Sequence, residues 1–147
     1  MSQIRNFMTA SAHAIGCDQS LKFAHDRMQQ FGIHQLPVLE GGVLVGVLSE
    51  RDIALISAVS PGQLDTILVE EAMAAEPYAV GPSDDIGRVV AHMVEHKYGS
   101  AVVMDHNKVI GLFTSMDALR LLAEMLAQQG ARTTDGKERS STRAAKK

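Results

Sequence analysis

Two stretches of the chain share one pattern: FGIHQLPVLEGGVLVGVLSERDI (31–53) and KYGSAVVMDHNKVIGLFTSMDAL (97–119). Each has a short apolar run, a turn of polar or glycine residues and a second apolar run that contains a glycine. Each then has Ser or Thr three residues before Asp. Apolar runs around such a turn are typical of a β-hairpin. We therefore expect two hairpins, with strands at 36–39 and 43–48 and at 101–104 and 108–113.

An internal repeat extends the similarity beyond the hairpins. A shift of 65 residues places Met8 on Met73, Gly16 on Gly81 and Met28 on Met93, with no gap. Because an offset that holds over a whole half defines a repeating fold unit, we expect two copies of one supersecondary structure.

Each copy is expected to hold five elements in the order β-α-β-β-α. The apolar residues Leu21, Ala24 and Met28 recur at helical spacing, as their counterparts do in the second copy. Pro61 and Gly62 break the chain between the copies. The expected elements outside the hairpins are extended segments at 14–16 and 79–81, helices at 20–31 and 85–96, closing helices at 50–59 and 115–129, and a short helix within 64–72.

The resulting fold class is α+β. A unit of about 60 residues buries too little apolar surface to be stable alone, so the two copies should pack sheet to sheet as one pseudo-twofold module. The expected boundaries are a first motif at 1–63 (core 8–59), a second motif at 64–129 (core 73–129) and a tail at 130–147.

Composition favours an ordinary globular protein. Of the 147 residues, 46% are hydrophobic and 21% are charged, a balance that excludes wholesale disorder. No run approaches the roughly 20 apolar residues of a membrane helix, so no membrane association is predicted. Cys17 is the single cysteine, which excludes an internal disulfide and favours the reducing cytoplasm.

Charge is distributed unevenly along the chain. The formal net charge is −3, but residues 131–147 hold six Lys/Arg against two acidic residues, a local +4, while the remainder carries −7. An acidic body argues against nucleic acid as the main partner, except through the basic tail. The tail has almost no large apolar residue, so we expect it to be disordered.

The pattern Ser49-x-x-Asp52 recurs as Thr114-x-x-Asp117, each time where a strand is expected to meet a helix. The structural interpretation is a helix capping box. A functional interpretation adds to it without excluding it. A helix N-terminus favours phosphate, a hydroxyl there adds a donor, and a carboxylate one turn later can accept from both hydroxyls of a ribose.

These stretches, with Met8-Thr9 ahead of the first, resemble the cystathionine-β-synthase (CBS) domain family. The Pro-Val strand, the glycine of the next strand and the Ser/Thr-x-x-Asp ending carry the resemblance, which covers residues 1 to about 128. It implies a stand-alone tandem CBS pair, or Bateman module. Such a pair is expected to regulate a partner protein, still unknown, by binding an adenosine nucleotide in clefts between the motifs and changing conformation or dimer form.

By the same resemblance, Ser49 and Thr114 would bind the phosphate. Asp52 and Asp117 would bind the ribose. The ligand would be AMP, ADP or ATP, with S-adenosylmethionine as a further candidate, and no other cofactor is implied. Segments 33–37 and 98–102 would wall the adenine. The wall residues are Ile33, Gln35, Leu36, Pro37, Tyr98, Ser100, Ala101 and Val102.

The two clefts differ in charge. Arg51 precedes Asp52 and can pair bidentately with a phosphate, whereas Met116 precedes Asp117. This predicts tighter binding of charged phosphates at the first cleft. The alternative for Arg51 is a solvated helix residue paired with Glu50 or Asp52.

Two other functions compete with nucleotide sensing. The first is a structural adaptor that dimerises with empty clefts. The second is a metal-dependent hydrolase, since His92-x-x-Glu95-His96 matches a zinc-protease pattern; its repeat counterpart carries no such chemistry, so we predict neither a metal site nor catalytic residues. Cys17 beside Asp18 is a poor nucleophile. The apolar helices at 50–59 and 116–129 predict a homodimer.

Overall fold

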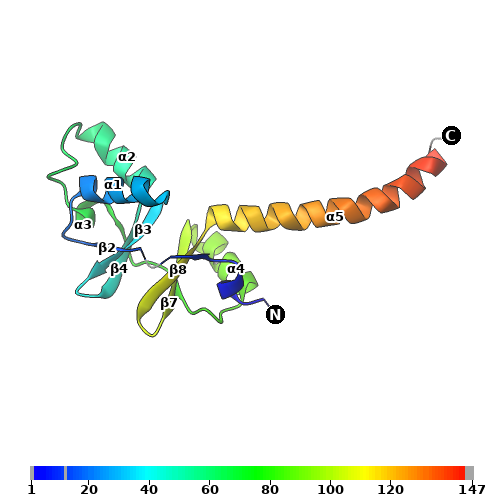
Figure 1. The fold of residues 1–147 in the computed structure, drawn as a ribbon, viewed down its shortest axis with the longest axis horizontal. Helices are drawn as coiled ribbons and strands as arrows, with labels where there is room; N and C mark the ends of the chain where they lie inside the picture. Colours follow the sequence, from blue (N-terminus) through cyan, green and yellow to red (C-terminus); the bar gives the residue numbers. More distant parts are fainter. Residues whose placement is uncertain (1, 12, 145–147) are drawn as a thin grey trace.

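The computed structural model describes the backbone of residues 2–11 and 13–144, and side chains as far as residue 131. Two mixed lobes lie side by side, and a long helix projects from the second (Figure 1). The β-α-β-β-α order is confirmed in both copies. In chain order the elements are η1 (Ile4–Asn6), β1 (Thr9–Ala10), β2 (Ile15–Gly16), α1 (Leu21–Phe31), β3 (Gln35–Glu40), β4 (Val43–Ser49), α2 (Glu50–Val59), α3 (Val69–Ala72), β5 (Ala74–Ala75), β6 (Ala79–Val80), α4 (Ile86–His96), β7 (Ser100–Asp105), β8 (Lys108–Thr114) and α5 (Ser115–Ala144).

The strands form two four-stranded sheets, β2-β3-β4-β5 and β1-β8-β7-β6. The hairpins β3-β4 and β7-β8 are antiparallel, and β2 and β6 add to them in parallel. The fourth strand of each sheet comes from the other copy, because β1 pairs with β8 and β5 pairs with β4. Each copy therefore begins by completing the sheet of its partner, an exchange that the repeat alone does not reveal.

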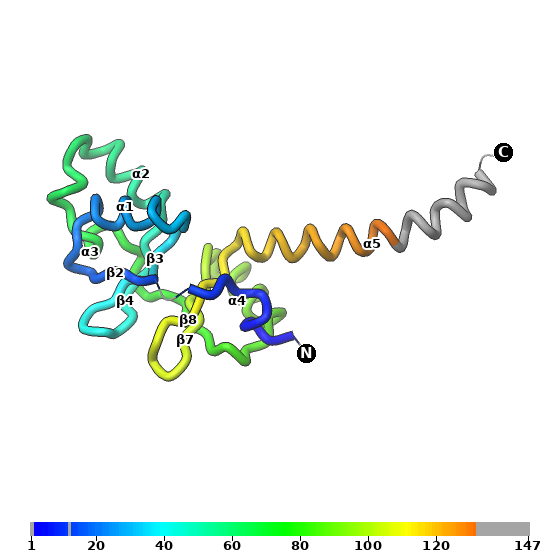
Figure 2. Tube along the Cα trace, viewed as in Figure 1, coloured from blue at the N-terminus to red at the C-terminus, as the bar shows by residue number. Residues whose placement is uncertain are grey.

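Backbone hydrogen bonds repeat this exchange at the same 65-residue offset. The Ile4 N–H donates to the Asp84 carbonyl at 2.8 Å, and the Val69 N–H donates to the Gln19 carbonyl at 2.8 Å. Ile4 and Val69 are fully buried, each in the core of the other copy. Figure 2 shows the N-terminal segment beside the strands and helix of the second copy. The two copies thus form one module with approximate twofold symmetry.

Gly46 and Gly111 sit where the exchanged strands approach most closely. A Cβ on Gly46 would lie 2.5 Å from the Met73 Sδ and 2.8 Å from the Ala74 carbonyl oxygen. A Cβ on Gly111 would lie 2.6 Å from the Met8 Sδ and 2.8 Å from a carbonyl oxygen of β1. Carbon and oxygen do not pack at 2.8 Å, so both positions require glycine. The match of Met8 with Met73, and of Gly46 with Gly111, follows from this single contact.

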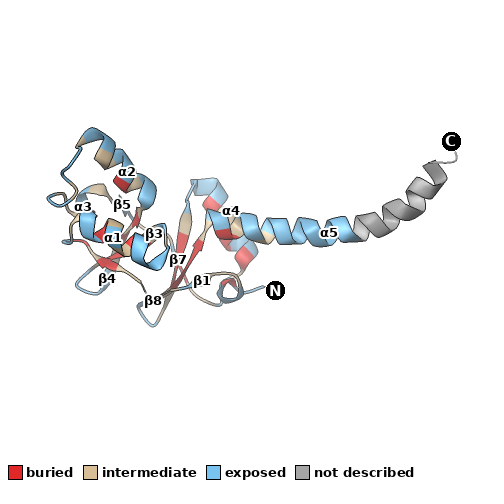
Figure 3. Ribbon diagram, turned by 45° about the horizontal axis from the view of Figure 1, so that its top comes forward, coloured by how far each residue is buried: buried red, intermediate tan, exposed pale blue. Residues whose placement is uncertain are grey.

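The core of each lobe lies between its sheet and its first helix. α1 buries Leu21, Ala24 and Met28, the apolar positions expected from the helical spacing, and α4 buries the equivalent face. Figure 3 shows the buried residues gathered on the strands and on these helix faces. Among the residues that the structure describes, every helix is too short or too polar to span a bilayer.

The last helix differs from expectation in length. α5 continues past residue 129, where the sequence predicts it to end, so its backbone is helical over most of the segment predicted to be disordered. The expectation of disorder rests on the near absence of large apolar residues after residue 130, and the two tail residues whose side chains are described, Gly130 and Ala131, are exposed. Residues 145–147 of the tail lie outside the described residues.

Candidate nucleotide-binding cleft

Both Ser/Thr-x-x-Asp sequences form helix capping boxes, as the structural interpretation predicts. The Asp52 N–H donates to the Ser49 Oγ at 3.0 Å, and the Ser49 N–H donates to the Asp52 Oδ2 at 3.0 Å. In the second copy the Asp117 N–H donates to the Thr114 Oγ1 at 3.2 Å, and the Thr114 N–H donates to the Asp117 Oδ2 at 2.9 Å. Each box holds a hydroxyl and a carboxylate at the junction of a strand and a helix.

The start of each predicted adenine wall lies next to one of these boxes. Gln35 pairs with Ser49 across β3 and β4, and Ser100 pairs with Thr114 across β7 and β8. In each copy, the carbonyl of the residue just before the first hairpin strand accepts the first N–H of the helix that follows the hairpin. In the first copy, the Glu50 N–H donates to the His34 carbonyl at 2.8 Å. The hairpin register therefore places a wall segment beside a hydroxyl in each copy.

A cavity of about 470 Å³ opens at Thr114 and Asp117, and we name it the Asp117 cleft. Its volume falls in the range of about 300–1,000 Å³ that is usual for small-molecule sites. Three segments from both copies line it, which places it between the motifs. The lining residues are Thr9, Ser11, Gly32, Ile33, His34, Gln35, Leu112, Thr114, Ser115, Met116, Asp117 and Arg120.

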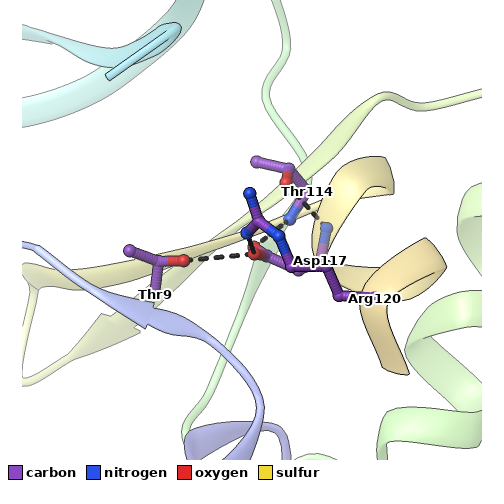
Figure 4. Close-up of polar contacts among 4 residues, drawn as sticks. All are labelled: Thr9, Thr114, Asp117 and Arg120. Atoms are coloured by element: carbon purple, nitrogen blue, oxygen red, sulfur yellow. Dashed lines mark hydrogen bonds and ion pairs between the residues drawn. The ribbon is translucent and has the colours of Figure 1, made fainter. Parts of the chain in front are cut away.

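The carboxylate of Asp117 is the most constrained group in this cleft. Its residue is only 9% exposed. Besides the capping bond, its Oδ1 accepts from the Thr9 hydroxyl and from the Arg120 guanidinium, each at 3.2 Å. Figure 4 shows the two donors converging on this oxygen from β1 and from α5. The exchanged strand β1 thus supplies one donor to a carboxylate whose other hydrogen-bond donors belong to the second copy.

Asp52 has a simpler environment. Its carboxylate accepts one hydrogen bond within the described part of the chain, from the Ser49 N–H. Arg51 is exposed, and no acidic side chain among the described residues lies within ion-pairing distance of it. Glu50 instead contacts His34, whose Nδ1 lies 2.7 Å from its Oε2. Arg51 is therefore not held by Glu50 or Asp52, the alternative that the sequence left open.

The predicted wall residues fall into three groups. Ile33 and Gln35 line the Asp117 cleft. Tyr98 instead lines a groove between α4 and α5, where its ring lies 5.3 Å from the His96 ring. The remaining apolar members are fully buried in the core, so they offer a ligand no side-chain surface in this arrangement: Leu36, Pro37, Ala101 and Val102.

The groups proposed for other chemistry do not assemble into a site. His92 and His96 stack on each other with centroids 4.1 Å apart, and His92 also contacts the ring of Tyr78. Among the described residues no three His, Cys, Asp or Glu side chains gather as metal ligands would. Burial raises the pKa of the Cys17 thiol, and Glu40 and Glu70 raise it further, which keeps it protonated.

The two side chains that bond the Asp117 carboxylate, those of Thr9 and Arg120, are not among the site residues predicted from the sequence. Arg120 follows Asp117 by three residues on one helix, and this spacing alone places the two on one face. Thr9 was noted only as part of Met8-Thr9. Its contact with Asp117 depends on the strand exchange, for which the sequence carries no local signal.

Comparison with known proteins agrees with this architecture. The CBS domain family model matches residues 4–58 and 69–124. The CBS domain-containing protein YhcV of Bacillus subtilis is 29% identical over 112 residues, covering 76% of this chain and 79% of that protein. The solved CBS domain pair of protein MJ0100 has a TM-score of 0.74 at 21% identity, covering 85% of this chain and 98% of that chain. The solved structure of CBSX2 has a TM-score of 0.71 at 21% identity, covering 85% of this chain and 99% of that chain. The chain belongs to the CBS domain family and contains two copies of the domain.

Proposed function

We propose that this protein is a regulatory module that binds an adenosine nucleotide between its two CBS domains and transmits the binding to a partner protein. One observation carries the proposal: a single cavity brings Thr114 and Asp117 of the second copy together with Ile33 and Gln35 of the first. A hydroxyl, a helix N-terminus and a carboxylate suit a ribose phosphate, and the flanking segment offers apolar cover and an amide for a purine.

Relatives of the same fold support the ligand class. The MJ0100 domain pair was solved in complex with 5′-methylthioadenosine and S-adenosyl-L-methionine, and CBSX2 was solved in complex with AMP. These ligands share an adenosine, which is the part that a carboxylate and an apolar wall recognise. CBS pairs are generally regulatory, and no three His, Cys, Asp or Glu side chains among the described residues gather as the ligands of a metal ion would.

Regulation follows from where the ligand would sit. A compound in the Asp117 cleft contacts β1 and the start of β3 on one side and α5 on the other. A ligand shifts a conformational equilibrium only through unequal affinity for the two states. Because the cleft joins elements of both copies, any change in their relative arrangement changes the ligand contacts, and bound nucleotide therefore favours one arrangement.

Titration calorimetry with AMP, ADP, ATP and S-adenosylmethionine tests the proposal, on the parent chain and on Asp52→Ala and Asp117→Ala. We expect Asp52→Ala to remove the tighter binding event, since its carboxylate is the less occupied, and Asp117→Ala to remove the weaker one. Circular dichroism checks that each variant is folded. If neither parent nor variants bind any of the four compounds, the protein is better described as a dimerising adaptor.

We also propose that the protein is a homodimer joined through its second CBS domain. An apolar groove of about 740 Å³ runs between α4 and α5. Its rim and the adjacent face of α5 carry large apolar side chains that are about half exposed or more: Val94, Leu119, Leu122, Met125 and Leu126. Exposed apolar area of this kind marks an interface. The spacing of Leu119, Leu122 and Leu126 on one helix suits packing against a second copy of α5.

A further inference from the structure

The carboxylate that we propose binds ribose is already largely occupied by protein donors. A carboxylate offers about four acceptor positions on two oxygens. The Oδ1 of Asp117 accepts from Thr9 and Arg120, which fills that oxygen, and the Oδ2 accepts from the Thr114 N–H. One position remains, whereas a ribose presents two neighbouring hydroxyl groups. A ribose can therefore bind Asp117 through both hydroxyls only if one donor leaves.

Arg120 is the donor that can leave. The Thr114 N–H belongs to the capping box, and the Thr9 side chain is short and rises from a backbone held in the sheet. The Arg120 side chain is 69% exposed and reaches Asp117 through one nitrogen, Nη1, at 3.2 Å. A long, exposed side chain with a single contact loses little when it moves, provided that the guanidinium finds another anion.

We propose that Arg120 makes the Asp117 cleft selective for adenosine nucleotides that carry a phosphate, over uncharged adenosine compounds. A phosphate near Thr114 offers the guanidinium a bidentate partner, so Arg120 moves from Asp117 to the phosphate and frees Oδ1 for the ribose. Adenosine or methylthioadenosine has no such anion. Displacing Arg120 would then leave the guanidinium as well as the buried carboxylate without an ion-pair partner, with no new ion pair to offset the loss. The inference rests on the proposed function and specifies its ligand class.

At Asp52, no side-chain donor competes with the ribose for the carboxylate among the described residues. The counterpart of Arg120 in the first copy is Leu55, and the counterpart of Thr9 is Ala74. Asp52 keeps its Oδ1 free of hydrogen bonds within the described residues. Arg51 lies on the N-terminal side of Asp52 and does not contact it. Binding of a ribose in the first cleft should therefore displace no protein donor, so that any preference for a phosphate there comes from Arg51, and competition for the carboxylate belongs to the Asp117 cleft.

Titration of the full chain with AMP and with adenosine tests the proposal. An Asp52→Ala background silences the first cleft, so that the signal reports the Asp117 cleft. In this background we expect AMP to bind at least about tenfold more tightly than adenosine. Adding Arg120→Ala should weaken the binding of AMP by about tenfold and strengthen the binding of adenosine, so that the selectivity for AMP disappears. The matched control is Arg88→Ala, an exposed arginine of α4 away from the cleft, which should change neither affinity.

Opposite changes for the two ligands are the decisive result. If Arg120→Ala weakens AMP and adenosine equally, or changes neither, Arg120 does not compete for Asp117 and the inference is wrong. If the Asp52→Ala chain binds nothing while the parent binds AMP, the proposed function survives and the inference fails. If the parent binds neither compound, the proposed function itself fails. Thr9→Val is a second test, which leaves Arg120 in place. It removes one hydrogen bond to the Asp117 Oδ1, so it should strengthen the binding of adenosine without weakening the binding of AMP.

Discussion

The two capping boxes of this protein have the same backbone geometry and different surroundings. Asp52 and Asp117 each accept the N–H of their own Ser or Thr at about the same distance. Only Asp117 is also bonded by Thr9 and Arg120. Both donors come from positions that carry apolar residues in the other copy. The duplicated frame thus fixes where a sugar and phosphate would bind, and residues outside the Ser/Thr-x-x-Asp pattern set what each site accepts.

The helices that follow the two capping boxes, α2 and α5, also carry different residues at equivalent positions. α5 presents Leu122 and Met125 to solvent, whereas the equivalent positions of the first copy are Ser57 of α2 and Ser60 just after it. The groove beside α5 is therefore lined by apolar side chains that the equivalent face of the first copy lacks. α2 exposes Leu55 and Val59 instead, at positions that α5 fills with Arg120 and Glu124.

The largest expected effect is on dimerisation, and it distinguishes the exposed face of α5 from the equivalent face of α2. Leu122→Glu should place a charge in the proposed interface and weaken dimerisation by at least about 2 kcal/mol, the level of an interface hot spot. Ser57→Glu, at the equivalent position of α2, should leave the dimer intact. Light scattering coupled to size exclusion measures both masses. A dimer that survives Leu122→Glu and dissociates with Ser57→Glu would place the interface on the first copy.

A second prediction tests how closely the two sheets match. Gly46→Val and Gly111→Val should each lower the free energy of unfolding by about 1–3 kcal/mol, because the new side chain overlaps the exchanged strand. The two losses should be nearly equal, since the contact distances are. Urea denaturation measures them. Gly99→Ala is the control, because a Cβ there meets no atom within 4 Å. Unequal losses would show that the sheets do not share this contact.

The smallest expected effect compares the two carboxylates in the absence of nucleotide. Asp52→Ala and Asp117→Ala each remove the carboxylate that accepts the N-cap N–H in a capping box, a contribution of about 1 kcal/mol. Asp117→Ala also removes the bonds from Thr9 and Arg120, so it should lower the free energy of unfolding by about 1 kcal/mol more. Thermal and urea unfolding at neutral pH measure the difference. Equal losses would mean that the additional bonds at Asp117 contribute nothing to stability.

Much of the fold and part of the site can be predicted from the residue pattern. Local spacing identifies both hairpins and helices, because amphipathic periodicity depends only on nearby residues. The capping boxes are local for the same reason. The adenine wall is predicted less well: Leu36, Pro37 and Val38 are buried in succession, as are Ala101, Val102 and Val103, and whether both faces of a strand are covered depends on what packs there.

Sequence alone determined that this chain consists of two equivalent halves, each with a strand that ends in a hydroxyl and a carboxylate. Tertiary structure alone decided that β1 and β5 exchange between the halves, which brings Thr9 to Asp117 and Ile33 to the same cavity. The physical reason is separation along the chain. Thr9 and Asp117 are 108 residues apart, and contacts at that distance are set by how whole sheets pack and not by local propensity.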